Sequence, residues 1–157
     1  MSYEIIGETI KSATSIKLGE IFDNPKRYKE NVTNQTYPNF HIIQVTLTPT
    51  PEGISGRTTD NKYSNRIRLD YLMNIQYRLA QNTETISNLR QQLDVVGLKL
   101  CTEFTELDLE RPTKVYNTYY EIVDGVLQFF FNISVFAVPQ INEAVKLNEY
   151  KLNEEVN

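Results

Sequence analysis

Hydrophobic residues alternate with residues that are polar, except for Leu72, over residues 65–79, NRIRLDYLMNIQYRL. Seven apolar or aromatic side chains occupy every second position from Ile67 to Leu79. A period of two is typical of a strand with one buried face, and this one would extend about 50 Å. Because strands usually have about 5–6 residues, we expect part of it to project beyond a compact core or to belong to an extended hairpin.

The segment FHIIQVTLT (40–48) is the candidate partner strand, since it is rich in β-branched and aromatic residues. We expect it to stop at Pro49, which cannot donate to a strand ladder. The segment before it, residues 23–39, carries turn residues without a period and is interpreted as a surface connection. Residues 49–64 form a polar stretch with two prolines and two glycines. We predict a protruding loop that contacts a neighbouring protein, because such a long excursion without its own core is uncommon.

Two stretches have helical periodicity. Residues 3–22 place Ile6, Ile10 and Ala13 on one face, which predicts an amphipathic helix ending near Phe22. A second helix is predicted over about 84–105, with Thr83 as its N-cap. Its apolar positions follow spacings of three and four, with Cys101 beside the stripe, and are Ile86, Leu89, Leu93, Val96, Leu100, Phe104 and Leu107. Packing of this helix on strand 65–79 is expected to bury Leu93, Val96, Leu100, Tyr71, Met73 and Ile75.

A second hairpin is predicted from strands 114–122 and 126–137. Asp124-Gly125 lies between them, and this dipeptide favours the two-residue turn in which both central residues have positive φ. Along 126–137, one face carries Leu127, Phe129, Phe131, Ile133 and Val135. The opposite face carries Phe130 and Phe136 among polar residues, so we expect a helix or another subunit to cover it.

The predicted order is therefore helix, hairpin, helix, hairpin, and the spacing at 141–157 is also compatible with a short C-terminal helix. Two main helices packed on one face of a mostly antiparallel sheet make an α+β fold. The length of 157 residues fits one domain over 1–157. The loop 49–64 and the tail 138–157 are expected to lie outside its compact part.

Composition and charge narrow the classes of function. The formal net charge is −4 and the pI is about 5.1, so no overall field attracts nucleic acid or anionic lipid. The N-terminus has no signal-peptide pattern, and the apolar run 126–138 is too short to span a membrane. Cys101 is the single cysteine, which excludes an intrachain disulfide and a four-cysteine zinc site. A reducing compartment such as a cytoplasm fits.

No catalytic, cofactor or metal site is predicted. His41 is the single histidine and lies in a predicted strand without a neighbouring carboxylate or thiol, so we interpret it as structural. Cys101 beside an apolar stripe is interpreted as buried rather than nucleophilic. The glycines of EGISG neither follow a strand nor open a helix, so a phosphate-binding loop is disfavoured. The chain is therefore not expected to be an enzyme.

Two charged groups are candidates for contact surfaces. Arg66, Arg68 and Arg78 line the polar face of strand 65–79, and Arg57 and Lys62 precede it. They form either a solvated face that discourages edge pairing or an electrostatic surface for another protein. Together with Phe130 and Phe136 they are the candidate partner-binding residues. The second group is acidic and lies at or beyond the end of the second helix, where it opposes the helix dipole. It comprises Glu103, Glu106, Asp108 and Glu110.

The hairpin sequence resembles a known family. Tyr120, Glu121, Ile122, Val123, Asp124, Gly125, Val126, Leu127 and Phe129 form the pattern Y-E-I-V-D-G-V-L-x-F. With the basic residue that leads the long strand, the amphipathic helix and the segment YPNFHIIQV, this pattern resembles phage tail terminator proteins over about 40–137. The loop 49–64 and the tail 138–157 match less well.

The resemblance implies a structural virion protein, made in the host cytoplasm and located at the head–tail junction. Such proteins form a six-subunit ring that stops polymerisation of the tail tube and presents a surface to the neck. The implied partners are other copies, the tail tube protein, a neck or connector protein, and a sheath protein if the tail is contractile. The ring would enclose the channel for the genome. The four acidic residues are expected to face that channel and repel DNA, and the alternative is that they form a solvated outer loop.

Two alternatives remain open from the sequence. One is another head–tail joining or tail-completion protein. The other is a monomeric cytoplasmic binding module whose second apolar hairpin face is covered by its own helix.

Overall fold

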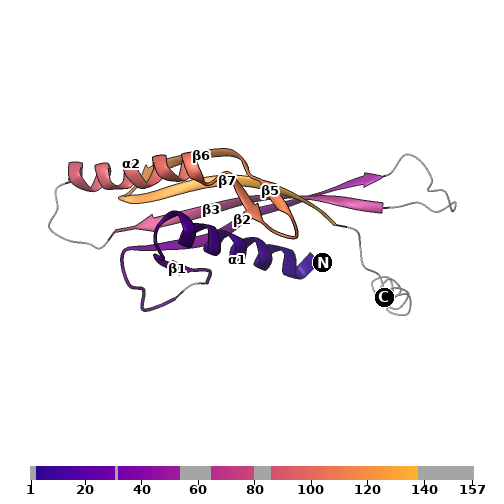
Figure 1. Ribbon diagram of the computed structural model, residues 1–157, viewed down its shortest axis with the longest axis horizontal. Helices are drawn as coiled ribbons and strands as arrows, with labels where there is room; N and C mark the ends of the chain where they lie inside the picture. The colour runs from indigo at the N-terminus through magenta and orange to yellow at the C-terminus, as the bar shows by residue number, and fades with distance from the viewer. Residues whose placement is uncertain (1–2, 31, 54–64, 80–85, 138–157) are drawn as a thin grey trace.

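The computed structural model describes residues 3–30, 32–53, 65–79 and 86–137, with side chains described for 6–30, 32–51, 67–79 and 88–137. Two helices and seven strands follow one another along this part of the chain (Figure 1). They are α1 (Tyr3–Ile21), β1 (Lys26–Tyr28), β2 (Asn39–Gly53), β3 (Asn65–Arg78), α2 (Ile86–Glu103), β4 (Glu106–Asp108), β5 (Pro112–Lys114), β6 (Tyr116–Val123) and β7 (Val126–Ala137).

The main sheet has the strand order β1-β2-β3-β7-β6. All its neighbouring strands are antiparallel except β1 and β2, which pair in parallel over three residues. The predicted α+β class, with two helices on a mostly antiparallel sheet, is therefore confirmed. The predicted order is incomplete, because it omitted β1 and the small antiparallel hairpin β4–β5.

The β2–β3 hairpin is longer than the sequence suggested. β2 continues through Pro49 and Pro51 to Gly53, and Pro51 lies opposite Ile67. The prediction that this strand stops at Pro49 was wrong. β1 pairs with β2 only as far as His41, so the rest of β2 is a sheet edge. A proline there costs no ladder bond when its nitrogen faces the free side.

The second predicted hairpin is confirmed in its turn and corrected in its first strand. Asp124 has φ 52° and Gly125 has φ 75°, as the two-residue turn requires. The predicted strand 114–122 is divided into β5, which pairs with β4, and β6, which pairs with β7. Val115 lies between them and donates its N–H to the carbonyl of Thr105.

The core lies on one side of the main sheet, which we call the inner face. β3 contributes Leu69, Tyr71, Met73 and Ile75 to it, and β7 contributes Leu127, Phe129, Phe131 and Ile133, each at most 4% exposed. Leu93, Leu100 and Phe104 pack on it from α2 and the residue after α2, and Ile6, Ile10, Ala13 and Leu18 pack on it from α1. The predicted burial of Leu93, Leu100, Tyr71, Met73 and Ile75 is confirmed, and Val96 is half-buried.

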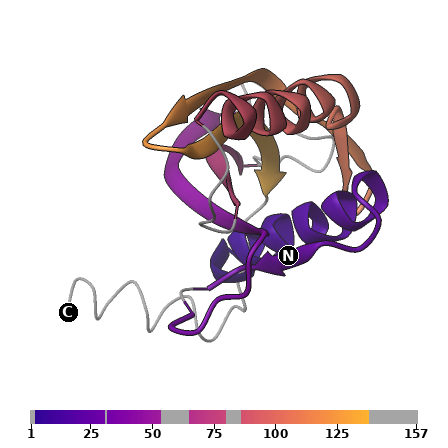
Figure 2. The ribbon, with the colours of Figure 1, turned by 90° about the vertical axis from the view of Figure 1, so that its left-hand side faces the viewer.

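The helices divide the inner face between them. α1 packs on β2, α2 packs on β6 and β7, and β4 contacts α1. The prediction that the second helix packs on strand 65–79, which is β3, was therefore wrong, although the residues named for that contact are largely buried. Figure 2 shows the β4–β5 hairpin bridging the two helices along one side of the curved sheet. α2 approaches β6 closely at Gly97, where an added Cβ would lie 2.7 Å from the Tyr120 ring. The Tyr120 hydroxyl donates to Asp94 over 2.9 Å, which fixes the same contact.

The remaining differences from the predicted boundaries are local. α2 ends at Glu103, and residues 80–85, with the proposed cap Thr83, lie outside the described residues. The proposed C-terminal helix 141–157 and the tail 138–157 lie outside them as well. Of the predicted loop 49–64, residues 49–53 belong to β2 and the others are not described.

Candidate interaction surfaces

The side of the sheet opposite the helices, which we call the outer face, is one candidate surface. It is formed on β3 by Arg68, Asp70, Leu72, Asn74, Gln76 and Arg78, on β7 by Gln128, Phe130, Asn132, Ser134 and Phe136, and on β6 by Tyr116, Tyr119, Glu121 and Val123. Within the described residues, neither helix lies on this face. The expected cover by a helix of the same chain is therefore not found in this part of the chain.

Aromatic side chains on the outer face are only partly covered. Phe130 stacks on Tyr119, with ring centroids 5.0 Å apart and an interplanar angle of 20°. Phe136 is 44% exposed and Tyr119 is 51% exposed. The two predicted partner-binding phenylalanines thus share the outer face, and exposed aromatic surface of this kind is typical of protein contact sites.

A hydrogen-bonded chain of polar groups crosses the outer face from β3 to β6. Arg68 Nε donates to Asp70 Oδ2 over 3.0 Å, the Ser134 hydroxyl donates to Asp70 Oδ1, and Ser134 Oγ lies 2.6 Å from the Tyr116 hydroxyl. The Ser134 hydrogen bond, followed by those from Arg68, holds the pKa of Asp70 below its usual value. The network orients these side chains, so the outer face is an ordered surface.

The predicted basic residues do not form one patch. Arg68 is paired with Asp70, and Arg78 donates to Gln76 Oε1 over 2.8 Å at the other end of β3. Ten residues of one strand separate them, which is about 33 Å. Arg66 lies opposite Glu52 in the β2–β3 ladder, while Arg57 and Lys62 lie outside the described residues. The role of these five residues in partner binding stays a prediction.

The acidic group lies on the helix side of the molecule. Glu103 ends α2, Glu106 and Asp108 belong to β4, and Glu110 lies in the turn before β5. Glu103, Asp108 and Glu110 are exposed, and Glu106 is half-buried opposite Lys114. The hairpin therefore mixes signs, and its orientation toward a channel stays a prediction.

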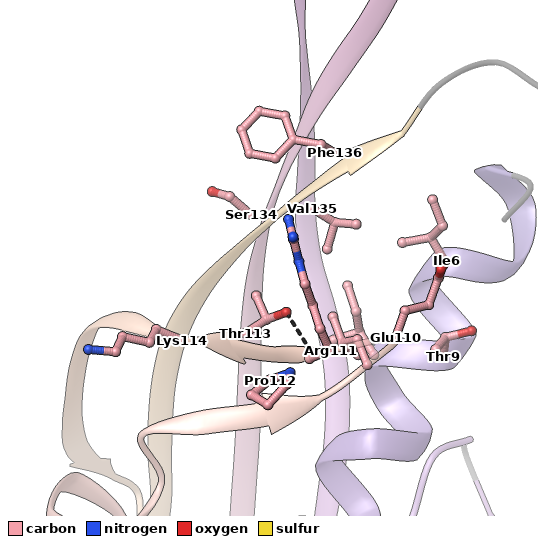
Figure 3. A pocket seen from close by; sticks show the side chains of 12 residues that line it. Ile6, Thr9, Glu110, Arg111, Pro112, Thr113, Lys114, Ser134, Val135 and Phe136 are labelled. Carbon is pink, nitrogen blue, oxygen red and sulfur yellow. Dashed lines mark hydrogen bonds between the residues drawn. The ribbon is translucent and has the colours of Figure 1, made fainter.

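A groove of about 700 Å³ runs between α1, the β4–β5 hairpin and the end of β7 (Figure 3). Ile6, Leu109 and Val135 give it apolar walls, and Phe136 lies at its mouth. The Arg111 side chain extends along it toward β7, whereas Lys114 points away. Thr113 donates its hydroxyl to the Arg111 carbonyl, which fixes the turn.

A second hollow, of about 510 Å³, lies at the β1 end of the sheet, and we call it the aromatic pocket. Its lining consists of Phe22, Pro25, Lys26, Tyr37, Pro38, Phe40 and Tyr77. Phe40 packs between Phe22 and Tyr77, with centroid distances of 5.0 and 4.6 Å. Sequence reasoning missed this pocket because its residues come from five separate segments, and 23–39 had been interpreted as a plain connection.

The two groups considered for catalysis, His41 and Cys101, are buried and half-buried, respectively. His41 lies in β2 and is 8% exposed, and burial, with Arg78 and Lys11 nearby, lowers its pKa. Burial raises the pKa of the Cys101 thiol, which disfavours the reactive thiolate.

Among the described residues there is no cluster of side chains suited to hold a metal ion. No helix in the same part of the chain is long and apolar enough to cross a membrane.

Comparison with known proteins identifies the family. A family model described as phage tail terminator protein matches residues 9–145, a range that includes every strand, α2 and most of α1. No curated protein sequence gives a significant match. The resemblance inferred from the β6–β7 hairpin is thereby confirmed. Because the family model covers far more than half of the sequence, this chain belongs to the phage tail terminator protein family and is a structural component of a bacteriophage tail.

Proposed function

We propose that copies of this chain assemble into a homohexameric ring on the head-proximal end of the tail tube. The ring stops tube polymerisation and provides the surface to which the head or neck attaches. The observation that carries this proposal is the family match over residues 9–145. The alternative of a monomeric binding module lacks such support.

Two features of the fold favour assembly. The outer face carries Tyr119, Val123 and Phe136, each more than two-fifths exposed, without cover from α1 or α2. β2 also presents Val45 and Leu47 to solvent on a sheet edge. Apolar surface in several places on one chain is what a ring requires, because each copy contacts two neighbours through different patches.

The partners proposed for the ring are the tail tube protein, a neck or connector protein, and a sheath protein if the tail is contractile. The ring would reach its place at the head–tail junction after assembly in the host cytoplasm. It needs no cofactor and no specific nucleic-acid contact. We retain the proposal that Glu103, Glu106, Asp108 and Glu110 face the channel, where carboxylates would repel the phosphates of passing DNA.

Two measurements test the ring. The mass of the purified chain in solution should rise with concentration to that of six copies, and electron microscopy should place the chain at the upper end of the tail. Phage lacking the gene should produce tails of uncontrolled length that carry no heads. Tails of normal length in its absence, or a monomer at every concentration, would contradict the proposal.

A further inference from the structure

Among the described residues, the end of β2 is a sheet edge that no further strand covers. We call residues 46–53 of β2 the β2 arm. Leu47 and Pro49 lie opposite Tyr71 and Leu69 of β3. Those two β3 residues are buried, whereas Leu47 is 40% exposed and Pro49 is also exposed. Figure 1 shows β2 and β3 extending past both helices at this end. The apolar side chains of the β2 arm are therefore exposed and can contact another protein.

The β2 arm is poorly suited to pair with a strand of another chain. Pro49 and Pro51 are two residues apart and share one side of β2. Neither has an N–H, so an added strand would find no donors at these two positions. What the β2 arm presents instead is a pair of proline rings in an extended segment. Aromatic-lined grooves bind such segments through side-chain contact.

The aromatic pocket has the complementary chemistry. Phe22, Phe40 and Tyr77 form its floor, and Tyr37, which is 44% exposed, stands at its rim. Its volume of about 510 Å³ is ample for a proline ring with its flanking backbone. Lys26 is exposed and also lines the pocket.

A chain cannot place its own β2 arm in its own pocket. Phe40 of the pocket and Pro51 of the β2 arm belong to the same strand and are eleven residues apart. At the rise of an extended strand this separation is about 36 Å. The two surfaces thus lie at opposite ends of β2, as a head-to-tail contact between copies requires.

We propose that Pro49 and Pro51 of one copy dock in the aromatic pocket of a second copy. This inference rests on the proposed ring and specifies one contact between its neighbours. It is a heterologous contact, which generates a closed ring when its rotation closes. The β2 arm supplies the proline rings, and the pocket supplies aromatic faces.

Disulfide trapping tests the contact in the full chain. With Cys101→Ser as background, the pair Pro51→Cys and Lys26→Cys should give interchain disulfides under mild oxidation. A ladder of covalent oligomers should appear on a non-reducing gel. The matched control keeps Pro51→Cys and moves the second cysteine to the exposed α2 position Gln91. It should give far less cross-linking at the same ring concentration.

A double-mutant cycle supplies an independent measurement. Pro51→Ala and Tyr37→Ala change exposed side chains, so both variants should fold. Each should raise the concentration for half-assembly about 3- to 10-fold, and the double variant should be little worse than either single one. Thr48→Ala, on the other side of the β2 arm, is the control and should assemble normally.

The outcomes separate the contact from the ring. Rings of normal mass with cross-linking at the control level, or fully additive effects in the cycle, would overturn the contact and leave the ring standing. A chain that stays monomeric at every concentration would overturn both. Cross-linking between copies together with non-additive effects supports the contact.

Discussion

The two faces of β7 carry the same residue type in opposite surroundings. Phe129 and Phe131 point to the inner face and are fully buried. Phe130, between them, and Phe136 point to the outer face, where Phe136 remains 44% exposed. A period of two sends neighbours in one strand to opposite sides. The inner phenylalanines therefore serve folding, while the outer ones are candidates for contacts with other proteins.

The inner pair is enclosed by the chain after α2. The Phe104 ring lies 4.8 Å from that of Phe131 and 5.6 Å from that of Phe129. On the outer face the corresponding partner of Phe130 is Tyr119, which itself is half exposed. The inner and outer phenylalanines therefore differ in how much of their apolar area folding removes from water. The stabilisation that each contributes is roughly proportional to that area.

The largest effect is expected for Phe131→Ala. Truncation of this fully buried ring removes apolar contacts and leaves a cavity, so the free energy of unfolding should fall by about 3–5 kcal/mol. Urea unfolding at neutral pH measures it. A loss below about 1 kcal/mol would mean that the inner face is not the core.

A smaller effect is expected on the outer face for Phe130. The stacked Phe130–Tyr119 pair should contribute a coupling of about 0.5–1.5 kcal/mol to stability. The cycle of Phe130→Ala, Tyr119→Ala and the double variant isolates it from the burial of either ring. A coupling near zero would show that the stacked geometry carries no energy in solution.

The division between the two faces could be predicted because it rests on local periodicity. The alternation from Ile67 to Leu79 and the turn at Asp124-Gly125 determine which side chains share a face, whatever the rest of the chain does. β1 could not be predicted in this way. Three residues, Lys26–Tyr28, carry no period, and they pair only because the chain returns beside Asn39–His41.

The contact surfaces were less predictable for the same reason. The position of Phe130 and Phe136 on the outer face could be predicted because an apolar residue at an outer position breaks the alternation. The aromatic pocket gives no such signal, since Phe22, Tyr37 and Tyr77 meet only in the folded chain. The end of β2 was missed because a proline usually stops a strand, and the rule does not hold at a free edge.

His41 is an exception to the division between the two faces, because it occupies an outer position and is nevertheless buried. His41 lies opposite Gln76 and is buried. Burial first, then Arg78 and Lys11, lower its pKa, while Glu30 acts in the opposite direction. As the pH falls through about 6.5, the unfolded chain binds a proton that the folded chain still excludes. Stability should therefore be full above that pH and decrease below it, until the folded-state pKa is reached.

The check for His41 is the change in unfolding free energy between about pH 7.5 and about pH 5.5, the range in which a histidine titrates. The wild type should lose more stability over this range than His41→Gln, which cannot titrate. Carboxylates that begin to titrate contribute equally to both chains. Parallel curves would show that His41 is accessible to protons in the folded state.

The smallest effect on folding is expected for Phe136→Ala, and this variant tests the division most directly. Phe136 has the same side chain as Phe131, lies five residues later in the same strand and occupies the outer face. Because so much of its ring is already in water, its truncation should change the free energy of unfolding by no more than about 0.5–1 kcal/mol. If the outer face contacts another copy or a tail partner, the same variant should weaken assembly at unchanged stability. The measurements are urea unfolding and mass as a function of concentration, with Phe131→Ala as the comparison.

A loss of stability as large as that of Phe131→Ala would place Phe136 in the core and remove it from the candidate surface. Normal stability with normal assembly would remove it from the interface alone and leave the division between the two faces intact.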